Sequence, residues 1–119
     1  MEVHAEREGG ALIARAEGRI DGANAREFEN ALHAALGKDD SMLILDLQSL
    51  SYISSAGLRV ILMAAKILQG RGGKFVVCSL SESIDEVFEI SGFNRIIPTH
   101  ETRSDALAAL GEQAVPKYP

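Results

Sequence analysis

The chain has few of the features on which several classes of protein depend. Among its 119 residues Cys78 is the only cysteine, so no disulfide can form within the chain and a zinc site built on cysteines is not expected. Because Cys78 follows three apolar residues, we expect a buried and unreactive strand thiol. Basic clusters are also missing, and the formal net charge is -5. Binding to the phosphates of nucleic acids is therefore not expected.

Long hydrophobic runs are missing as well. The longest, 42–45 and 60–65, are far too short to cross a bilayer. Residues 1–7 are charged and contain no apolar segment of the kind that a signal peptide needs. We therefore expect a cytoplasmic protein with no membrane partner. With 46% hydrophobic and 24% charged residues, the composition is that of one ordinary globular domain.

The hydrophobic pattern predicts a β-hairpin followed by a helix. Roughly alternating apolar residues on both sides of a Gly-Gly pair predict paired strands over 2–7 and 11–17. Helical spacing of apolar residues then predicts a helix over 23–36. Asp21 lies just before this helix and is expected to cap it, and Gly37 is expected to end it.

Strands and helices alternate along the rest of the chain. Continuous apolar runs predict buried strands at 42–47 and 74–78. The segment between them is predicted to contain a loop over 48–54 and a helix over 55–68. The remaining predicted elements are a helix with a capping box at Ser83 and Glu86, a strand over 96–99 and a helix over 104–110. Helices that connect strands in this way imply parallel neighbours, so we expect a single-domain α/β fold: an open mixed β-sheet with helices packed on it.

The helix predicted over 55–68 is apolar on two sides. At about 100° per residue, the side expected to face the core carries Leu58, Ile61, Leu62, Ala65, Leu68 and Gln69. The opposite side carries a second apolar stripe, which we call the outer stripe, made of Ala56, Val60, Met63 and Ile67. Exposed apolar stripes typically mark interfaces, so we predict that the outer stripe docks a partner protein. Burial by another segment of this chain and a homodimer face are the two alternatives.

Two adjacent serines, Ser54 and Ser55, lie where the loop becomes this helix. One of them is expected to be the N-cap, but capping does not require two. A hydroxyl at a helix start is accessible to a kinase, and a phosphate there is favoured by the helix dipole. It would place about two negative charges beside the outer stripe, where they are costly to desolvate against a partner. We therefore predict a switch that blocks docking without unfolding the helix.

The segment around these serines resembles the signature of a known family. LDLQSLSYISSAGLRVIL, residues 45–62, is similar to the signature of STAS-domain proteins, specifically bacterial anti-sigma factor antagonists. GRIDGANAREFENAL, residues 18–32, and FNRIIP, residues 93–98, resemble two further segments of that family. The likeness covers nearly the whole chain. It implies a STAS-like domain, which we expect over residues 1–111. The residues beyond the last predicted helix, 112–119, are expected to form a flexible tail.

The resemblance also implies a function by partner switching. In that family the unphosphorylated protein binds an anti-sigma factor that is also a serine kinase, and a sigma factor is released. Phosphorylation breaks the complex, and a serine phosphatase restores it. Carried over to this sequence, the phosphorylated serine is Ser55, with Ser54 the less favoured acceptor in the place where many members have Asp. Asp21 takes the family's acidic position near the phosphorylation site.

The expected partner-binding residues lie at the start and along one side of the predicted helix, with Asp21 beside them. They are Asp21, Ser54, Ser55, Ala56, Gly57, Arg59, Val60, Met63 and Ile67. No cofactor or metal is expected, and we expect a monomer or weak dimer. The alternative function is a STAS accessory subunit of a larger complex, such as a lipid transporter, which docks through the same helix without a phosphorylation cycle. The hydroxyl of Ser55 favours the first function, because an accessory subunit needs none there.

An enzyme is not expected. Ser55 lacks the glycine framing of a hydrolase nucleophile, and the spacing of His4, His33 and His100 shows no acid partner for any of them. The loop GRGGK, residues 70–74, lacks the spacing of a phosphate-binding loop and is better explained as a helix end and turn.

Overall fold

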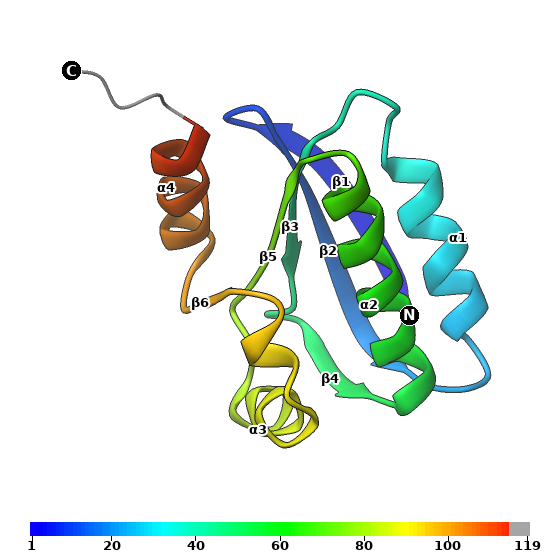
Figure 1. Cartoon of the computed structure of the whole chain (residues 1–119). Helices are drawn as coiled ribbons and strands as arrows, with labels where there is room; N and C mark the ends of the chain where they lie inside the picture. The colour runs from blue at the N-terminus through cyan, green and yellow to red at the C-terminus, as the bar shows by residue number, and fades with distance from the viewer. Residues whose placement is uncertain (115–119) are drawn as a thin grey trace.

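A mixed β-sheet forms the centre of the molecule in the computed structural model, which describes residues 1–114 and the side chains of residues 1–111 (Figure 1). The elements in chain order are β1 (Glu2–Glu8), β2 (Ala11–Ile20), α1 (Ala25–Ala35), β3 (Met42–Asp46), β4 (Leu50–Ile53), α2 (Ser55–Gly70), β5 (Lys74–Cys78), α3 (Glu82–Ser91), the 3-10 turn η1 (Phe93–Arg95), β6 (Thr99–His100) and α4 (Arg103–Ala114). The expected α/β fold is confirmed.

The strands follow the order β1-β2-β3-β5-β6, and β4 pairs with the far end of β2. β1 and β2 are antiparallel, and all other pairs are parallel. The hairpin turn is made by Gly9 and Gly10, whose φ angles of 60° and 83° lie in the left-handed region. Glycine adopts that region without steric cost. The hairpin and the alternation of helices with parallel strands are therefore as predicted.

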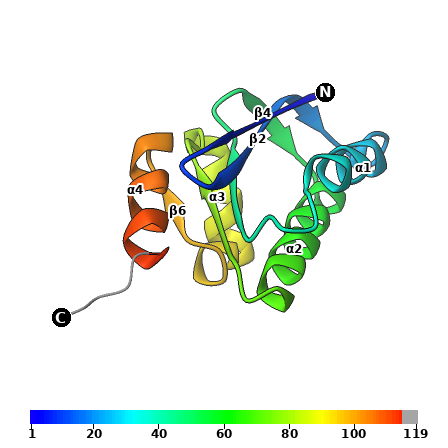
Figure 2. The same cartoon turned by 90° about the horizontal axis from the view of Figure 1, so that it is seen from above.

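Helices cover both faces of the sheet. The larger core lies under α1, α2 and α3, while α4 covers β3 and β5 from the other side (Figures 1 and 2). The smaller core beneath α4 is made of Ala11, Ile13, Ile44, Val76, Cys78, Ala106 and Leu110. Because β3 and β5 are covered on both faces, they are continuous apolar runs, as expected for central parallel strands.

A short strand replaces most of the predicted loop 48–54. β4 pairs in parallel with the last residues of β2, with Ile20 opposite Ile53. Leu50 and Ile53 are buried, whereas Ser51 and Tyr52 are exposed. Four residues of mixed polarity carry too weak a pattern to be recognised, and the strand exists because the ten-residue β2 extends far enough to pair with it.

Three other boundaries differ from the prediction. The N-cap of α3 is Ser81, whose hydroxyl accepts from the Ile84 amide at 3.3 Å, so the helix starts earlier than the predicted capping box. The last strand begins at Thr99, because Phe93–Arg95 forms a 3-10 turn and leaves Ile96 exposed. α4 continues to Ala114, three residues into the predicted tail. Residues 115–119 of that tail lie outside the described part of the chain.

Candidate functional site

The two serines occupy different positions at the junction between β4 and α2. Ser54 is the N-cap of α2, and its Oγ accepts a hydrogen bond from the Gly57 amide at 3.3 Å. The Ser54 amide donates to the Ile20 carbonyl at 2.9 Å, so this residue is tied to the end of β2. Ser55 is the first residue of the helix and is exposed, and its hydroxyl has no hydrogen bond within the described side chains. Capping is therefore complete with Ser54 alone.

The pairing of β2 with β4 brings Asp21 to the same edge of the sheet. With Ile20 opposite Ile53, the next residues along the two parallel strands are Asp21 and Ser54. The Asp21 carboxylate accepts from the amides of Ala23 at 2.9 Å and Asn24 at 3.2 Å. Asp21 thus supports the turn that enters α1, although the N-cap residue itself is Asn24. Two segments that are distant in sequence form one edge.

Gly57 has a packing role in this junction. It is buried, and a Cβ at this position would lie 2.7 Å from side-chain carbons of Ile20 and of Ile53. The first turn of α2 therefore approaches β2 and β4 so closely that only glycine fits without a shift. Gly57 thus has a packing role at the start of α2, and its part in partner binding stays a prediction.

The faces of α2 are rotated relative to the helical-wheel prediction. Val60, a member of the predicted outer stripe, is only 6% exposed and belongs to the core. Ala56 and Ile67 are half-buried against that core, and Met63, at 37% exposure, is the most exposed member of the stripe. The reason is α1, which packs beside α2 and covers this side of the helix. The alternative that another segment of the chain covers the stripe is therefore partly correct.

The exposed line along α2 is polar and positively charged, with one apolar member. We call it the α2 ridge and define it as Ser55, Arg59, Met63 and Lys66, all of which are exposed. At about 100° per residue these four side chains fall within an arc of about 80°. α2 contains no acidic residue, so the ridge carries two positive charges on a chain whose net charge is -5.

An exposed aromatic residue flanks the same edge. Tyr52 of β4 is 41% exposed and lies opposite Arg19 of β2, whose guanidinium carbon sits 4.4 Å from the centre of its ring. This is a cation–π contact. Neither residue is predicted from the sequence, because their proximity depends on strand β4, which the sequence pattern does not reveal. They extend the candidate surface from α2 onto the end of the sheet.

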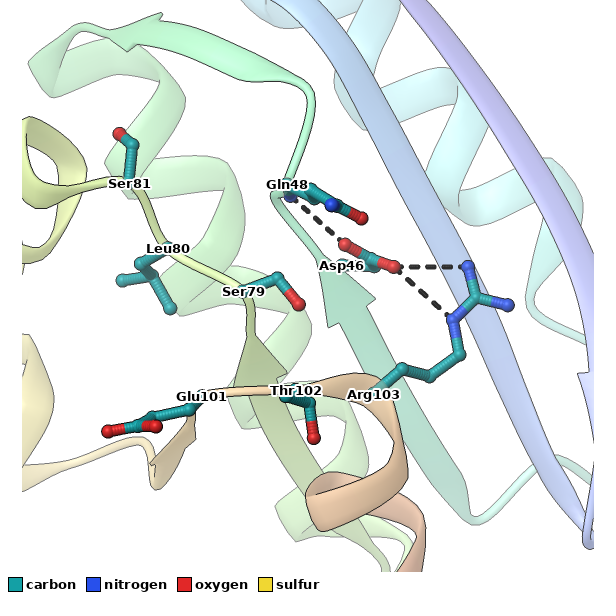
Figure 3. Close-up of a pocket in the computed structure, with 8 residues that line it drawn as sticks. All are labelled: Asp46, Gln48, Ser79, Leu80, Ser81, Glu101, Thr102 and Arg103. Atoms are coloured by element: carbon teal, nitrogen blue, oxygen red, sulfur yellow. Dashed lines mark hydrogen bonds and ion pairs between the residues drawn. The ribbon is translucent and has the colours of Figure 1, made fainter.

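A separate hollow of about 540 Å³ lies at the carboxyl ends of β3, β5 and β6 (Figure 3). The buried Asp46 carboxylate accepts from Arg103 at 3.0 and 3.3 Å and from the Gln48 amide at 3.0 Å, and Arg103 also donates to Glu6 at 2.7 Å. Burial alone would lower the pKa of Arg103, but the hydrogen bonds to Glu6 and Asp46 outweigh it and raise that pKa. The charged groups of the hollow are therefore paired with one another, and they fasten the start of α4 to the sheet.

Two further groups contain side chains that can bind metals or react. Cys78 is fully buried, as predicted, and burial raises the pKa of its thiol, which keeps it protonated and unreactive. Glu2, His4 and Glu17 offer three ligand atoms within 4.8 Å of one another. However, His4 is paired with Glu17 at 2.5 Å, and Arg15 lies 3.8 Å from the same carboxylate. These side chains form an exposed polar cluster on β1 and β2, and we assign no metal to it.

Comparison with known sequences gives consistent matches. The model of the STAS domain family matches residues 2–106. BtrV of Bordetella bronchiseptica, which is named as an anti-sigma factor antagonist, is 43% identical over 117 residues, covering 98% of this chain and 100% of BtrV. Among residues 1–114, no helix has the length and apolar character needed to cross a bilayer.

Solved structures show the same fold. A Thermotoga maritima protein named as an anti-sigma factor antagonist matches with a TM-score of 0.85 at 22% identity, over 91% of this chain and 93% of that chain. The anti-sigma factor antagonist SpoIIAA in its unphosphorylated form matches with a TM-score of 0.77 at 17% identity, over 98% and 100% of the two chains. Its phosphorylated form, from Bacillus, matches with a TM-score of 0.69 at 18% identity, over 91% and 98%. At these identities the likeness concerns the fold.

Proposed function

This chain belongs to the STAS domain family, and from that premise we propose that it is an anti-sigma factor antagonist that works by partner switching. In the unphosphorylated state it binds an anti-sigma factor with serine kinase activity, and this binding releases a sigma factor. Phosphorylation of Ser55 ends the binding, and a serine phosphatase restores it. We expect the cycle to take place in the cytoplasm. The protein itself is a regulator, because the partner performs the phosphoryl transfer.

The observation that carries this proposal is the division of roles between the two serines. Ser54 is engaged as the N-cap, whereas the Ser55 hydroxyl is exposed and has no hydrogen bond within the described side chains. A kinase can reach Ser55 without disturbing the cap. The names of BtrV and SpoIIAA support the same role, and SpoIIAA has a phosphorylated form.

The proposed transfer moves one phosphoryl group from ATP held by the partner kinase. A bond forms between Ser55 Oγ and the γ-phosphorus as the bond from that phosphorus to the leaving ADP breaks. The hydroxyl proton passes to a base of the kinase or to water. The product carries about two negative charges at the first residue of α2. Negative charge is favourable at a helix N-terminus, so α2 should remain folded.

Phosphorylation should end binding because it changes the charge of the α2 ridge. The partner is expected to cover the α2 ridge, where the apolar Met63 lies between Arg59 and Lys66. A partner that is complementary to two positive charges meets about two added negative charges after phosphorylation. Placing a highly charged phosphate in a desolvated interface is costly unless it is paired there.

A kinase assay tests the proposal. The protein is incubated with ATP and the anti-sigma kinases encoded in the same genome, and the phosphate is located by mass spectrometry. We expect one phosphate on Ser55, normal labelling of Ser54→Ala, and none on Ser55→Ala. Binding of the same kinase, measured by calorimetry, should be lost once Ser55 carries the phosphate. A protein that binds its partner but is phosphorylated by no candidate kinase would instead fit an accessory subunit of a larger complex.

A further inference from the structure

Arg59 lies one helical turn beyond Ser55 on the exposed face of α2. Residues four apart on a helix are surface neighbours, with Cβ atoms about 5–6 Å apart. Side chains on a helix also lean toward its N-terminus, so a long side chain at position 59 is directed back toward position 55. Both residues are exposed, and nothing separates them along the ridge. A group attached to the Ser55 hydroxyl is thus within reach of the Arg59 guanidinium.

The guanidinium of Arg59 is also free to take such a group. Several other arginines of the chain are already engaged: Arg7 with Asp40, Arg15 with Glu17, Arg19 with Tyr52, Arg71 with the carbonyls of Gly37 and Asp40, and Arg103 with Asp46 and Glu6. Within the described side chains, Arg59 has neither a hydrogen bond nor an ion pair. The helix offers it no competing acid, because α2 contains none.

We propose that Arg59 binds the phosphoryl group of phosphorylated Ser55 within the same molecule. This inference rests on the proposed function, in which Ser55 is the residue that is modified. The planar guanidinium can donate two parallel hydrogen bonds to phosphate oxygens. In the phosphorylated state the guanidinium is held by the protein's own phosphate and is withdrawn from the partner. Phosphorylation then acts twice on the α2 ridge, by adding negative charge and by occupying one of its two cations.

Two charged groups on neighbouring elements bear on the same phosphate. Asp21 directly follows β2, as Ser54 directly follows β4 after the paired Ile20 and Ile53, and it would oppose the dianion. Arg19, two residues before Asp21, is stacked on Tyr52. Both stay unchanged in the variants below, so their influence cancels in the comparison. Lys66 supplies a matched control. It is a cation on the same ridge, but it lies 11 positions from Ser55, which corresponds to about 16 Å along the helix axis.

The test is a phosphorus NMR titration of the full chain carrying phosphoserine at position 55, installed during translation so that no kinase is needed. Free phosphoserine loses its second proton near pH 6, and a bound cation lowers that pKa. We expect Arg59→Gln to raise it by about 0.4 unit, or about 0.5 kcal/mol at 1.36 kcal/mol per unit. Arg59→Lys should give an intermediate value, and Lys66→Gln should give the parent value. Equal pKa values for the parent and Arg59→Gln proteins would overturn the proposal.

A second measurement reports on Arg59 directly. The Nε–H signal of Arg59, assigned through the Arg59→Lys variant, should move downfield and exchange more slowly with water when position 55 carries phosphoserine. An unchanged signal would count against the contact. These measurements are independent of any kinase. If the kinase labels Ser55 but neither quantity changes, Arg59 is not the phosphate ligand. If both change but no kinase labels Ser55, the proposed function fails instead.

Discussion

The Ser54 hydroxyl accepts a hydrogen bond from the Gly57 amide at 3.3 Å, and this contact separates the roles of two adjacent serines. Ser54 satisfies one of the amides that every helix start leaves without an intrahelical partner. Ser55 keeps its hydroxyl free on the surface. The helix cap and the proposed modification site are therefore neighbours in sequence without competing for the same group.

Because only Ser54 caps α2, substitutions at the two serines should differ in their effect on protein stability. Ser54→Ala removes the acceptor and should lower the free energy of unfolding by about 1 kcal/mol. Ser54→Asp, which restores an acceptor, should recover most of that loss. Ser55→Ala is the matched control and should change the free energy by less than about 0.5 kcal/mol. Urea unfolding followed by circular dichroism measures all three. A larger loss for Ser55→Ala than for Ser54→Ala would reverse the assignment.

A larger residue at position 57 should destabilise the fold by steric overlap. The Cβ of Gly57→Ala would lie 2.7 Å from Ile20 and Ile53, and relieving that overlap should cost about 1–3 kcal/mol. Gly70→Ala is made in the same helix at a position where no atom lies within 4 Å of the added Cβ. It should be neutral or slightly stabilising. Thermal unfolding of the two variants gives the comparison, and equal melting temperatures would mean that the close approach of α2 is not needed.

A substitution at Met63 tests whether the partner protein binds at the α2 ridge. Met63→Asp places a charge in the middle of the α2 ridge, and we expect at least a tenfold loss of affinity for the anti-sigma factor, because an unpaired charge would be desolvated in the interface. Ile90 of α3 is 80% exposed and lies outside the ridge, so Ile90→Asp should bind normally. Calorimetry measures the affinities, and circular dichroism checks the fold. Loss of binding with Ile90→Asp and not with Met63→Asp would move the interface to α3.

The ion pair between Asp46 and Arg103 should hold the start of α4 against the sheet. Arg103→Met would leave the buried Asp46 carboxylate without its two guanidinium hydrogen bonds and should cost about 2 kcal/mol. Glu6→Gln removes only the more exposed partner of Arg103 and should cost less than about 0.5 kcal/mol. Urea unfolding gives both values. Amide hydrogen exchange in α4 should accelerate in Arg103→Met alone, and protection equal to the parent's would show that the pair does not fasten the helix.

The ion pair between Asp40 and Arg7 should contribute to the loss of stability at low pH. The hydrogen bond from Arg7 lowers the pKa of Asp40 below its usual value of 3.8. A carboxyl whose pKa is lower in the folded state contributes stability above its unfolded pKa and loses that contribution as the pH falls through the folded one. Unfolding free energy measured from pH 6 to pH 2 should therefore fall less steeply below pH 4 in Arg7→Gln than in the parent. Identical slopes would contradict a role for this pair.

The sequence by itself determined the features that depend on neighbouring residues. The hairpin follows from two glycines that accept positive φ, and the central strands follow from continuous apolar runs at β3 and β5. The presence of one cap and one further serine before α2 was also predictable, because capping is a local interaction. The segment around the serine pair, residues 45–62, together with residues 18–32 and 93–98, was enough to indicate the family.

Tertiary structure alone decided which surfaces are exposed. A helical wheel gives angles between residues but not the position of the next element. α1 packs against the side of α2 that the wheel predicts to face outward, and Val60 is buried there. Pairing of β4 with β2 brought Asp21 beside Ser54 and Arg19 over Tyr52. Asp46 and Arg103, 57 positions apart, are in contact because α4 packs on the second face of the sheet. Such contacts depend on the arrangement of whole elements in space, and no local pattern of residues encodes that arrangement.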